Sequence, residues 1–133
     1  MIPPDAGVLR TDGAPAAIGP YAQGRTGALG GRWIATSGQV GLDPATQALV
    51  PGGVAAETER AIRNLESVLR AGGASLAHVV KTTVFLADMA EFQAMNDVYG
   101  RWFQDPLPAR STVAVRELPR GARVEIEVWA FLP

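Results

Sequence analysis

The sequence has no cysteine, a single histidine (His78), a single lysine (Lys81) and no run of 18 apolar residues. The missing thiols exclude disulfides, cysteine nucleophiles and cysteine-based zinc or iron sites. With one histidine as the only soft ligand, a transition-metal site is not expected. The opening MIPPDAGVLRTD lacks the apolar stretch of a signal peptide. We therefore expect a soluble cytoplasmic protein with no metal and no membrane span.

Charge is nearly balanced, which argues against nucleic acid as a partner. The chain of 133 residues has 12 basic and 13 acidic side chains, for a net charge of -1, and the basic residues are scattered. A nucleic-acid surface normally needs a concentrated positive field. With 47% hydrophobic and 19% charged residues, we expect one globular domain over residues 1–133.

Glycine and proline divide the first half of the chain into short elements. We expect strands over residues 21–29 and 32–40, joined as a hairpin by Gly30-Gly31, then a loop over residues 41–53. From Val54 onward apolar residues recur every three or four positions between charged ones, which is typical of an amphipathic helix. Gly72-Gly73 is the kind of sequence at which such a helix ends.

A strand and a second helix should follow. The β-branched run over residues 79–87 predicts a largely buried strand. Asp88 and Glu91 form a capping-box signature, and the apolar spacing after them predicts a helix that reaches Phe103. Pro106 ends this helix.

Two alternating runs close the chain. They cover residues 111–117 and 122–132 and predict two strands around the turn LPRG. The order ββαβαββ favours an α+β domain with one mixed sheet that has two helices on one face.

The last strand places apolar residues on both of its faces. Val124, Ile126, Val128 and Ala130 point one way, and Glu125, Glu127, Trp129 and Phe131 point the other. Two helices cover only one face of a sheet. Because Trp129 and Phe131 are poorly suited to water, we expect the other face to pack against neighbouring subunits.

Arg110, in LPARSTVAV, is the residue most in need of a partner. A desolvated guanidinium at the start of a strand requires a planar anion, from the protein or from a ligand. Arg110 and Thr112 share a strand face, and Glu125 is expected on the neighbouring strand. One interpretation is a structural ion pair between Arg110 and Glu125. The other is a site in which Arg110 binds a substrate carboxylate while Glu125 holds a water.

Four further residues have both a structural and a functional interpretation. Ser37 lacks a GxSxG elbow, so it is either a hydrogen-bond donor in a pocket or an ordinary strand-end hydroxyl. Tyr21 follows Gly-Pro and suits a turn as well as a ligand contact. Asn96 interrupts the apolar stripe of the second helix and could serve helix packing. His78 is interpreted as the end of a loop rather than as a base.

Five stretches together resemble the reactive-intermediate deaminase family, also called RidA or YjgF. They are APAAIGPYAQG, WIATSGQVGLDP, VVKTTVFLADMAEFQAMNDVY, PARSTVAV and LPRGARVEIEVWA, in the order of the family and across nearly the whole chain. The resemblance implies a chorismate-mutase-like α+β fold, assembled as a homotrimer with clefts between subunits. It further implies hydrolysis of enamines and imines such as 2-aminoacrylate and 2-iminobutanoate to 2-oxo acids and ammonia, without a cofactor.

The resemblance also implies roles for individual residues. Arg110 matches the arginine that binds the substrate carboxylate, and Glu125 matches the glutamate that orients the attacking water. Tyr21, Ser37 and Asn96 fall on substrate-binding positions of the family, and Thr112 stands where many members have cysteine. The connection before Arg110 is a few residues shorter than usual, which bears on the rim of the pocket and on substrate preference.

Two other functions compete with the deaminase interpretation. A regulatory trimer could use Arg110 to bind a small 2-oxo or amino acid without turnover. RNA cleavage, ascribed to some relatives, suits neither the near-neutral charge nor the lack of a basic, aromatic platform.

Overall fold

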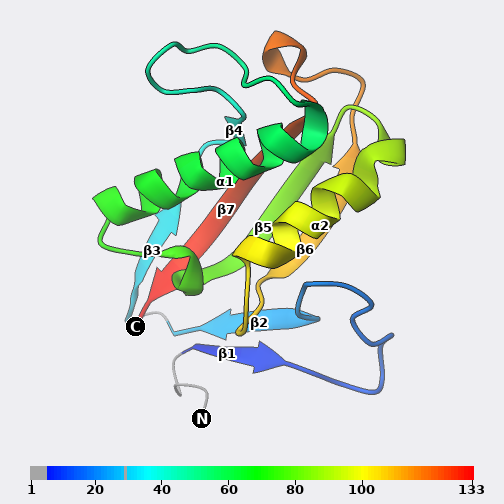
Figure 1. Cartoon of the computed structure of the whole chain (residues 1–133). Coiled ribbons are helices and arrows are strands. Elements are labelled where there is room, and N and C mark those ends of the chain that lie inside the picture. Colours follow the sequence, from blue (N-terminus) through cyan, green and yellow to red (C-terminus); the bar gives the residue numbers. More distant parts are fainter. Residues whose placement is uncertain (1–5, 29) are drawn as a thin grey trace.

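A five-stranded mixed sheet forms the centre of the molecule (Figure 1). The computed structural model describes residues 6–28 and 30–133. The strands of this sheet are β3 (Arg32–Ala35), β4 (Gln39–Val40), β5 (Val79–Leu86), β6 (Ala109–Ala114) and β7 (Val124–Leu132). They run in the order β3-β7-β5-β6, and β4 continues along β7 beside β3. Only the β5–β6 pair is parallel, so α+β with a mixed sheet is confirmed.

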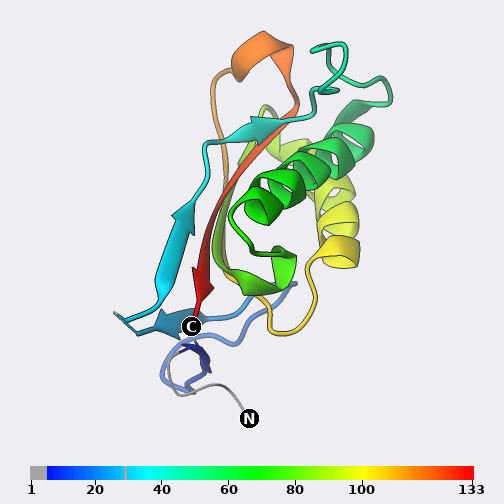
Figure 2. The same ribbon diagram turned by 90° about the vertical axis from the view of Figure 1, so that its left-hand side faces the viewer.

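Two helices, α1 (Gly53–Ala71) and α2 (Phe92–Trp102), cover one face of this sheet, as Figure 2 shows from the side. The apolar stripe of α1 packs on β7, with Ile62, Leu65 and Leu69 fully buried. The predicted end of this helix is confirmed, because Gly73 has φ +81° and its N–H donates to the Arg70 carbonyl. Among the described residues, no helix has the length and hydropathy of a membrane span.

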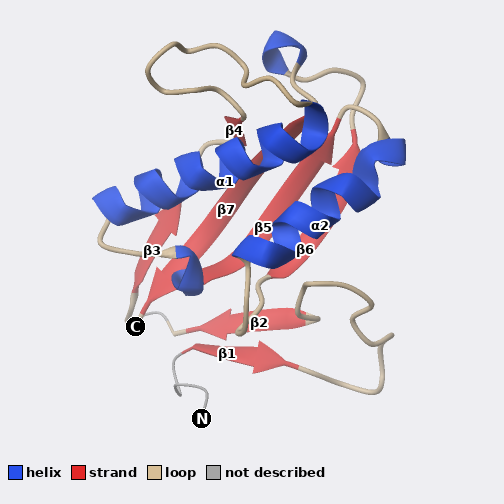
Figure 3. Ribbon diagram, in the orientation of Figure 1, coloured by secondary structure: helices blue, strands red, loops and turns tan. Residues whose placement is uncertain are grey.

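The predicted hairpin around Gly30-Gly31 is wrong. Strand β2 (Gly24–Gly27) pairs with β1 (Ala6–Leu9), an unpredicted strand, in a separate two-stranded sheet (Figure 3). Strand β3 instead pairs with β7. The expected strand over 32–40 is also interrupted, since the Thr36 hydroxyl and N–H bond the backbone of Val128 in place of a regular ladder.

The pairing expected for the last two strands is also wrong. Strand β5 lies between β6 and β7, so the turn through η3 (Pro119–Gly121) connects strands that are not neighbours. Helix α2 is the crossover between the parallel strands β5 and β6. Strand β6 begins two residues earlier than predicted and therefore includes Arg110.

Side chains cap the turns that precede β5 and α2, and the cap before α2 differs from the predicted capping box. Asp88 accepts a hydrogen bond from the Ala90 N–H (2.9 Å) and caps the short turn η2 (Met89–Glu91) that leads into α2. The Glu91 carboxylate does not close a capping box but pairs with Arg123. His78 ends the turn η1 (Leu76–His78), where its Nδ1 accepts from the Ser75 N–H (3.0 Å), as expected of a loop residue.

The face of the sheet away from the helices keeps an aromatic surface. The inward set on β7 is confirmed, since Val124, Ile126, Val128 and Ala130 are at most 1% exposed. On the other face Trp129 is 48% exposed and Trp33 42%. Phe131 differs from the expectation: it is buried within the chain, against Trp33 (ring centroids 4.6 Å apart) and Gly31. The large aromatic side chains that remain exposed on this face are therefore Trp33 and Trp129, and not Phe131.

Candidate functional site

Arg110 points toward the helix layer. In the ladder it is paired with Thr82 of β5, which in turn is paired with Val128 of β7. Residues directly opposite one another in a sheet share a face, and both Thr82 and Val128 are buried beneath the helices. The Arg110 side chain therefore lies between the edge strand β6 and α2.

Three aromatic rings surround the guanidinium. Its Cζ lies 4.6 Å from the ring centroid of Tyr99, 5.6 Å from that of Tyr21 and 5.7 Å from that of Phe92. Aromatic faces attract a cation but do not neutralise its charge. Burial lowers the pKa of Arg110, and the two tyrosines partly oppose that effect. The group remains a cation at neutral pH, because arginine pKa values lie far above that range.

Asn96 is the polar neighbour of this cation. Arg110 Nη1 donates to Asn96 Oδ1 at 2.7 Å, across the gap between β6 and α2. Since the oxygen of the amide must face the guanidinium, the amide nitrogen turns away from it. Among the described residues, the ion pairs are Arg70–Glu66 and Arg123–Glu91, so no carboxylate of this part of the chain pairs with Arg110.

A hollow of about 290 Å³ opens beside the guanidinium. Its lining, which we call the Arg110 pocket, consists of Ile18, Gly19, Tyr21, Phe92, Asn96, Arg110 and Thr112. Thr112 Oγ1 is buried and has no hydrogen-bond partner among the described residues. Buried hydroxyls are normally satisfied, so this atom and the free N–H groups of Arg110 make the pocket a candidate site for a polar ligand.

Glu125 lies on the other face of the sheet. In the ladder it is paired with Phe85, and through Phe85 with Val113, all three on the face opposite to Arg110. The expected approach of Arg110 to Glu125 within one chain is therefore wrong, and so is the structural ion pair between them. Glu125 is only partly covered on its own face.

Ser37 belongs to the Glu125 side. It lies between β3 and β4, and the next residue, Gly38, packs directly against the glutamate. A Cβ on Gly38 would lie 2.7 Å from Glu125 Cδ, so only glycine allows this approach. Within one chain the predicted site residues thus fall into two groups. Tyr21, Asn96, Arg110 and Thr112 line the Arg110 pocket, whereas Ser37 and Glu125 lie on the opposite face.

Several residues of the site escape prediction from the sequence. Phe92 and Tyr99 look like ordinary members of the apolar stripe of α2, and nothing in their spacing marks them as contacts of a cation. Ile18 is 93% exposed at the rim of the pocket, although it is a large apolar residue. Gly38, by contrast, could have been recognised from the sequence, because a glycine inside a strand pattern often marks a close approach of another group.

The described part of the chain has other hollows besides the Arg110 pocket. A hollow of about 330 Å³ adjoins β1 and the loop after it, but Gln23, its amide residue, already bonds the backbone of Thr11, Ala14 and Pro15. Nor do three or more acidic or histidine side chains gather as metal ligands anywhere in the described part of the chain.

Known proteins match this chain over most of its length. The family model described as "Endoribonuclease L-PSP" matches residues 11–132. The 2-iminobutanoate/2-iminopropanoate deaminase of Mus musculus is 52% identical over 92% of this chain and 89% of its own length. Its Homo sapiens counterpart is 46% identical, over 93% and 88%.

Solved structures share the fold along their whole length. RidA from an Antarctic Psychrobacter is 38% identical with a TM-score of 0.74, covering 95% of this chain and 99% of that one. E. coli TdcF with bound serine is 35% identical with a TM-score of 0.72, covering 96% and 99%. With a cationic pocket between sheet and helix and matches at this level, the chain belongs to the reactive-intermediate deaminase (RidA/YjgF) family.

Proposed function

We propose that this protein hydrolyses 2-imino acids, and the 2-enamino acids that tautomerise to them, to 2-oxo acids. Water adds to the carbon of the C=NH2⁺ group, the C–N bond then breaks, and the products are a 2-oxo acid and NH4⁺. The iminium carbon is already electrophilic. The enzyme therefore needs only to orient the substrate, position a water and move protons, and no cofactor enters the reaction.

The observation that carries this proposal is the state of Arg110. A half-buried guanidinium contacts three rings and one amide oxygen but no carboxylate of the described chain, and it lines a hollow. Leaving a buried cation without an anion is costly, whereas an arginine fork and a carboxylate form two parallel hydrogen bonds. Arg110 is thus the group that binds the substrate carboxylate and sets the plane of the C=N bond.

Neighbouring polar atoms complete the binding site on this side. Because Arg110 fixes the Asn96 oxygen, the Asn96 Nδ2 group is left as a donor. Thr112 Oγ1 supplies the second unused polar atom, and Tyr21 closes the wall together with Phe92. Threonine offers a ligand a stronger hydrogen bond than cysteine would, and without a cysteine the chain cannot be regulated through a thiol.

Glu125 acts from a neighbouring subunit in this proposal. It cannot reach Arg110 of its own chain, because the two lie on opposite faces of the sheet with β5 between their strands. A homotrimer in which the Trp129 face meets the next copy would bring Glu125, with Ser37, to the mouth of that copy's Arg110 pocket. The carboxylate then orients the attacking water.

The relatives support this choice of reaction. Proteins about half identical to this chain are named 2-iminobutanoate/2-iminopropanoate deaminases, and TdcF was crystallised with serine, an amino acid with a carboxylate. The family description names an endoribonuclease, but the net charge of -1 and the small size of the Arg110 pocket favour a small carboxylic acid over RNA.

The decisive assay generates 2-iminobutanoate in situ with a dehydratase and follows the release of 2-oxobutanoate. We expect the wild-type protein to accelerate release and Arg110→Ala to abolish the acceleration. Calorimetric titration with 2-oxobutanoate should show binding that also depends on Arg110. If the wild type binds the 2-oxo acid but gives no acceleration, the protein is a sensor and not a deaminase. If it does neither, the role given to Arg110 is wrong.

A further inference from the structure

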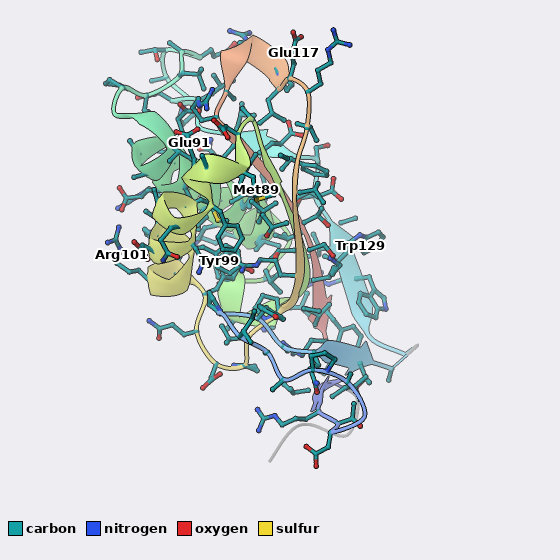
Figure 4. All side chains as sticks on the ribbon, turned by 90° about the vertical axis from the view of Figure 1, so that its right-hand side faces the viewer. Met89, Glu91, Tyr99, Arg101, Glu117 and Trp129 are labelled. Carbon is teal, nitrogen blue, oxygen red and sulfur yellow. The ribbon has the colours of Figure 1, made fainter. Side chains whose placement is uncertain are left out.

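The ring of Tyr99 packs against the guanidinium of Arg110. Tyr99 belongs to α2, is fully buried, and its ring is the nearest of the three to the guanidinium, at 4.6 Å. Figure 4 shows its side chain between helix and sheet, on the helix side of the strands. Unlike Tyr21 and Phe92, it is not part of the lining of the Arg110 pocket.

Two contacts hold this ring in place. The Tyr99 hydroxyl and Thr82 Oγ1 are 2.8 Å apart, and Thr82 is the ladder partner of Arg110. Phe103, one turn further along, stacks on the ring with centroids 4.4 Å apart and an interplanar angle of 27°. The ring is therefore tied to the strand next to Arg110 at one end and to its own helix at the other.

The chemistry of the phenol matters as well as its position. Burial raises the pKa of Tyr99 to about 12, although the hydrogen bond to Thr82 and the charge of Arg110 oppose this effect. The phenol is therefore neutral at any pH at which the protein would work. A neutral π face holds the cation without neutralising it, so the N–H groups of Arg110 that do not bind Asn96 stay available to an outside anion.

We propose that Tyr99 is a positioning residue: its ring, anchored by Thr82, sets the plane of the Arg110 guanidinium and through it the orientation of the bound carboxylate. This inference rests on the proposed function, in which Arg110 binds the substrate. It assigns a role in substrate orientation to a buried residue that is not part of the pocket lining. The ring is the part that matters, and the hydroxyl serves to anchor it.

The test compares three substitutions in the full-length protein. Tyr99→Leu removes the ring, Tyr99→Phe keeps the ring and loses the anchor, and Leu65→Ala is the control for a loss of core packing. Leu65 is fully buried on α1 and is not part of the lining of the Arg110 pocket. Tyr99→Met fills the space with a flexible chain and replaces Tyr99→Leu if that variant does not fold. The readouts are Tm, kcat, KM and the calorimetric Kd for 2-oxobutanoate.

We expect Tyr99→Leu to raise both KM and Kd about tenfold, with a smaller change in kcat, because the Arg110 guanidinium loses the ring that holds its plane. Tyr99→Phe should keep KM within about threefold while lowering Tm, since the Thr82 hydroxyl loses its partner. Leu65→Ala should lower Tm and leave KM within about twofold.

Equal KM values for Tyr99→Leu and Leu65→Ala would show that Tyr99 acts only as a core residue and would overturn the inference. So would a Tyr99→Phe variant as impaired in KM as Tyr99→Leu. These outcomes differ from a failure of the proposed function, in which the wild-type protein itself neither binds 2-oxobutanoate nor releases it from the imine.

Discussion

Arg110 and Glu125 project from opposite faces of one sheet. Arg110 is in register with the buried Thr82, and Glu125 with Phe85, three positions further along the same strand β5. An odd separation along a strand reverses the face. Any site that needs both side chains must therefore take them from different copies of the chain.

Mixing two inactive variants tests this arrangement directly. Arg110→Ala and Glu125→Gln should each be inactive alone. When the two are unfolded, mixed in equal amounts and refolded, random assembly of the proposed homotrimer gives sites with both wild-type side chains, and about a quarter of wild-type activity should return. A mixture as inactive as its components would show that Glu125 does not act across a subunit boundary.

The exposed Trp129 should hold the subunits together. Trp129→Glu places a charge on a side chain that is 48% exposed in the single chain, so the fold should survive while the oligomer dissociates. Light scattering after size exclusion would show a monomer, and activity would be lost. Met89→Glu is the control, because Met89 is 43% exposed near the start of α2, away from Trp129 (Figure 4). It should leave the oligomer intact.

The unpartnered hydroxyl of Thr112 should contribute to binding but not to stability. Thr112→Val keeps the shape of the side chain and removes Oγ1. We expect KM to rise by about threefold to tenfold, and the free energy of unfolding to stay constant or to increase by up to about 1 kcal/mol, since a buried unpaired hydroxyl is removed. Thr112→Ser retains the hydroxyl and should keep KM. A Thr112→Val variant that loses stability without a change in KM would make this hydroxyl structural.

Gly38 should control the position of the Glu125 carboxylate. A Cβ there would lie 2.7 Å from Glu125 Cδ and 2.9 Å from its Oε1, so Gly38→Ala must displace the carboxyl group. We expect kcat to fall by about 10-fold to 100-fold, with calorimetric binding of 2-oxobutanoate unchanged. Gly30→Ala, where a Cβ would meet no atom within 4 Å, is the control. Unchanged kcat in Gly38→Ala would argue against Glu125 as the group that orients water.

Tyr99 should also affect stability at high pH. Burial raises its pKa to about 12, above the value of about 10 in an unfolded chain, so the folded state retains the phenol proton longer. Its contribution is fully present below about pH 10 and is lost as the pH rises toward 12, at up to about 1.4 kcal/mol per pH unit. Urea unfolding should therefore show the wild type losing more stability than Tyr99→Phe over this window. Parallel curves would indicate that burial does not raise the pKa of Tyr99.

Local patterns in the sequence predicted the elements well. The three-to-four spacing of apolar residues marked α1 to within about a residue of each end, and the β-branched run marked β5. Alternation along β7 separated its buried face from its exposed one. Phe131 was the exception, because its cover comes from Trp33 and Gly31, which become its neighbours only through strand pairing. These patterns could be read because they repeat within a single element.

Strand partners were beyond the reach of the same reasoning. A hairpin was expected wherever a turn separated two alternating runs, yet β2 pairs with β1, and β5 enters between β6 and β7. The alternation of a strand shows which side chains share a face but not which strand lies beside it. The expected contact between Arg110 and Glu125 was wrong for that reason.

The sequence by itself determined the helices, the principal strands and the family motifs. It also placed Arg110 and Thr112 on the same face of one strand. These follow from local periodicity and residue chemistry. The tertiary structure alone decided that Arg110 rests on Tyr99, that Thr112 Oγ1 is left without a partner, and that Glu125 faces away from both. Such relations depend on contacts between residues far apart in the chain, which only the packing of the sheet against its helices creates.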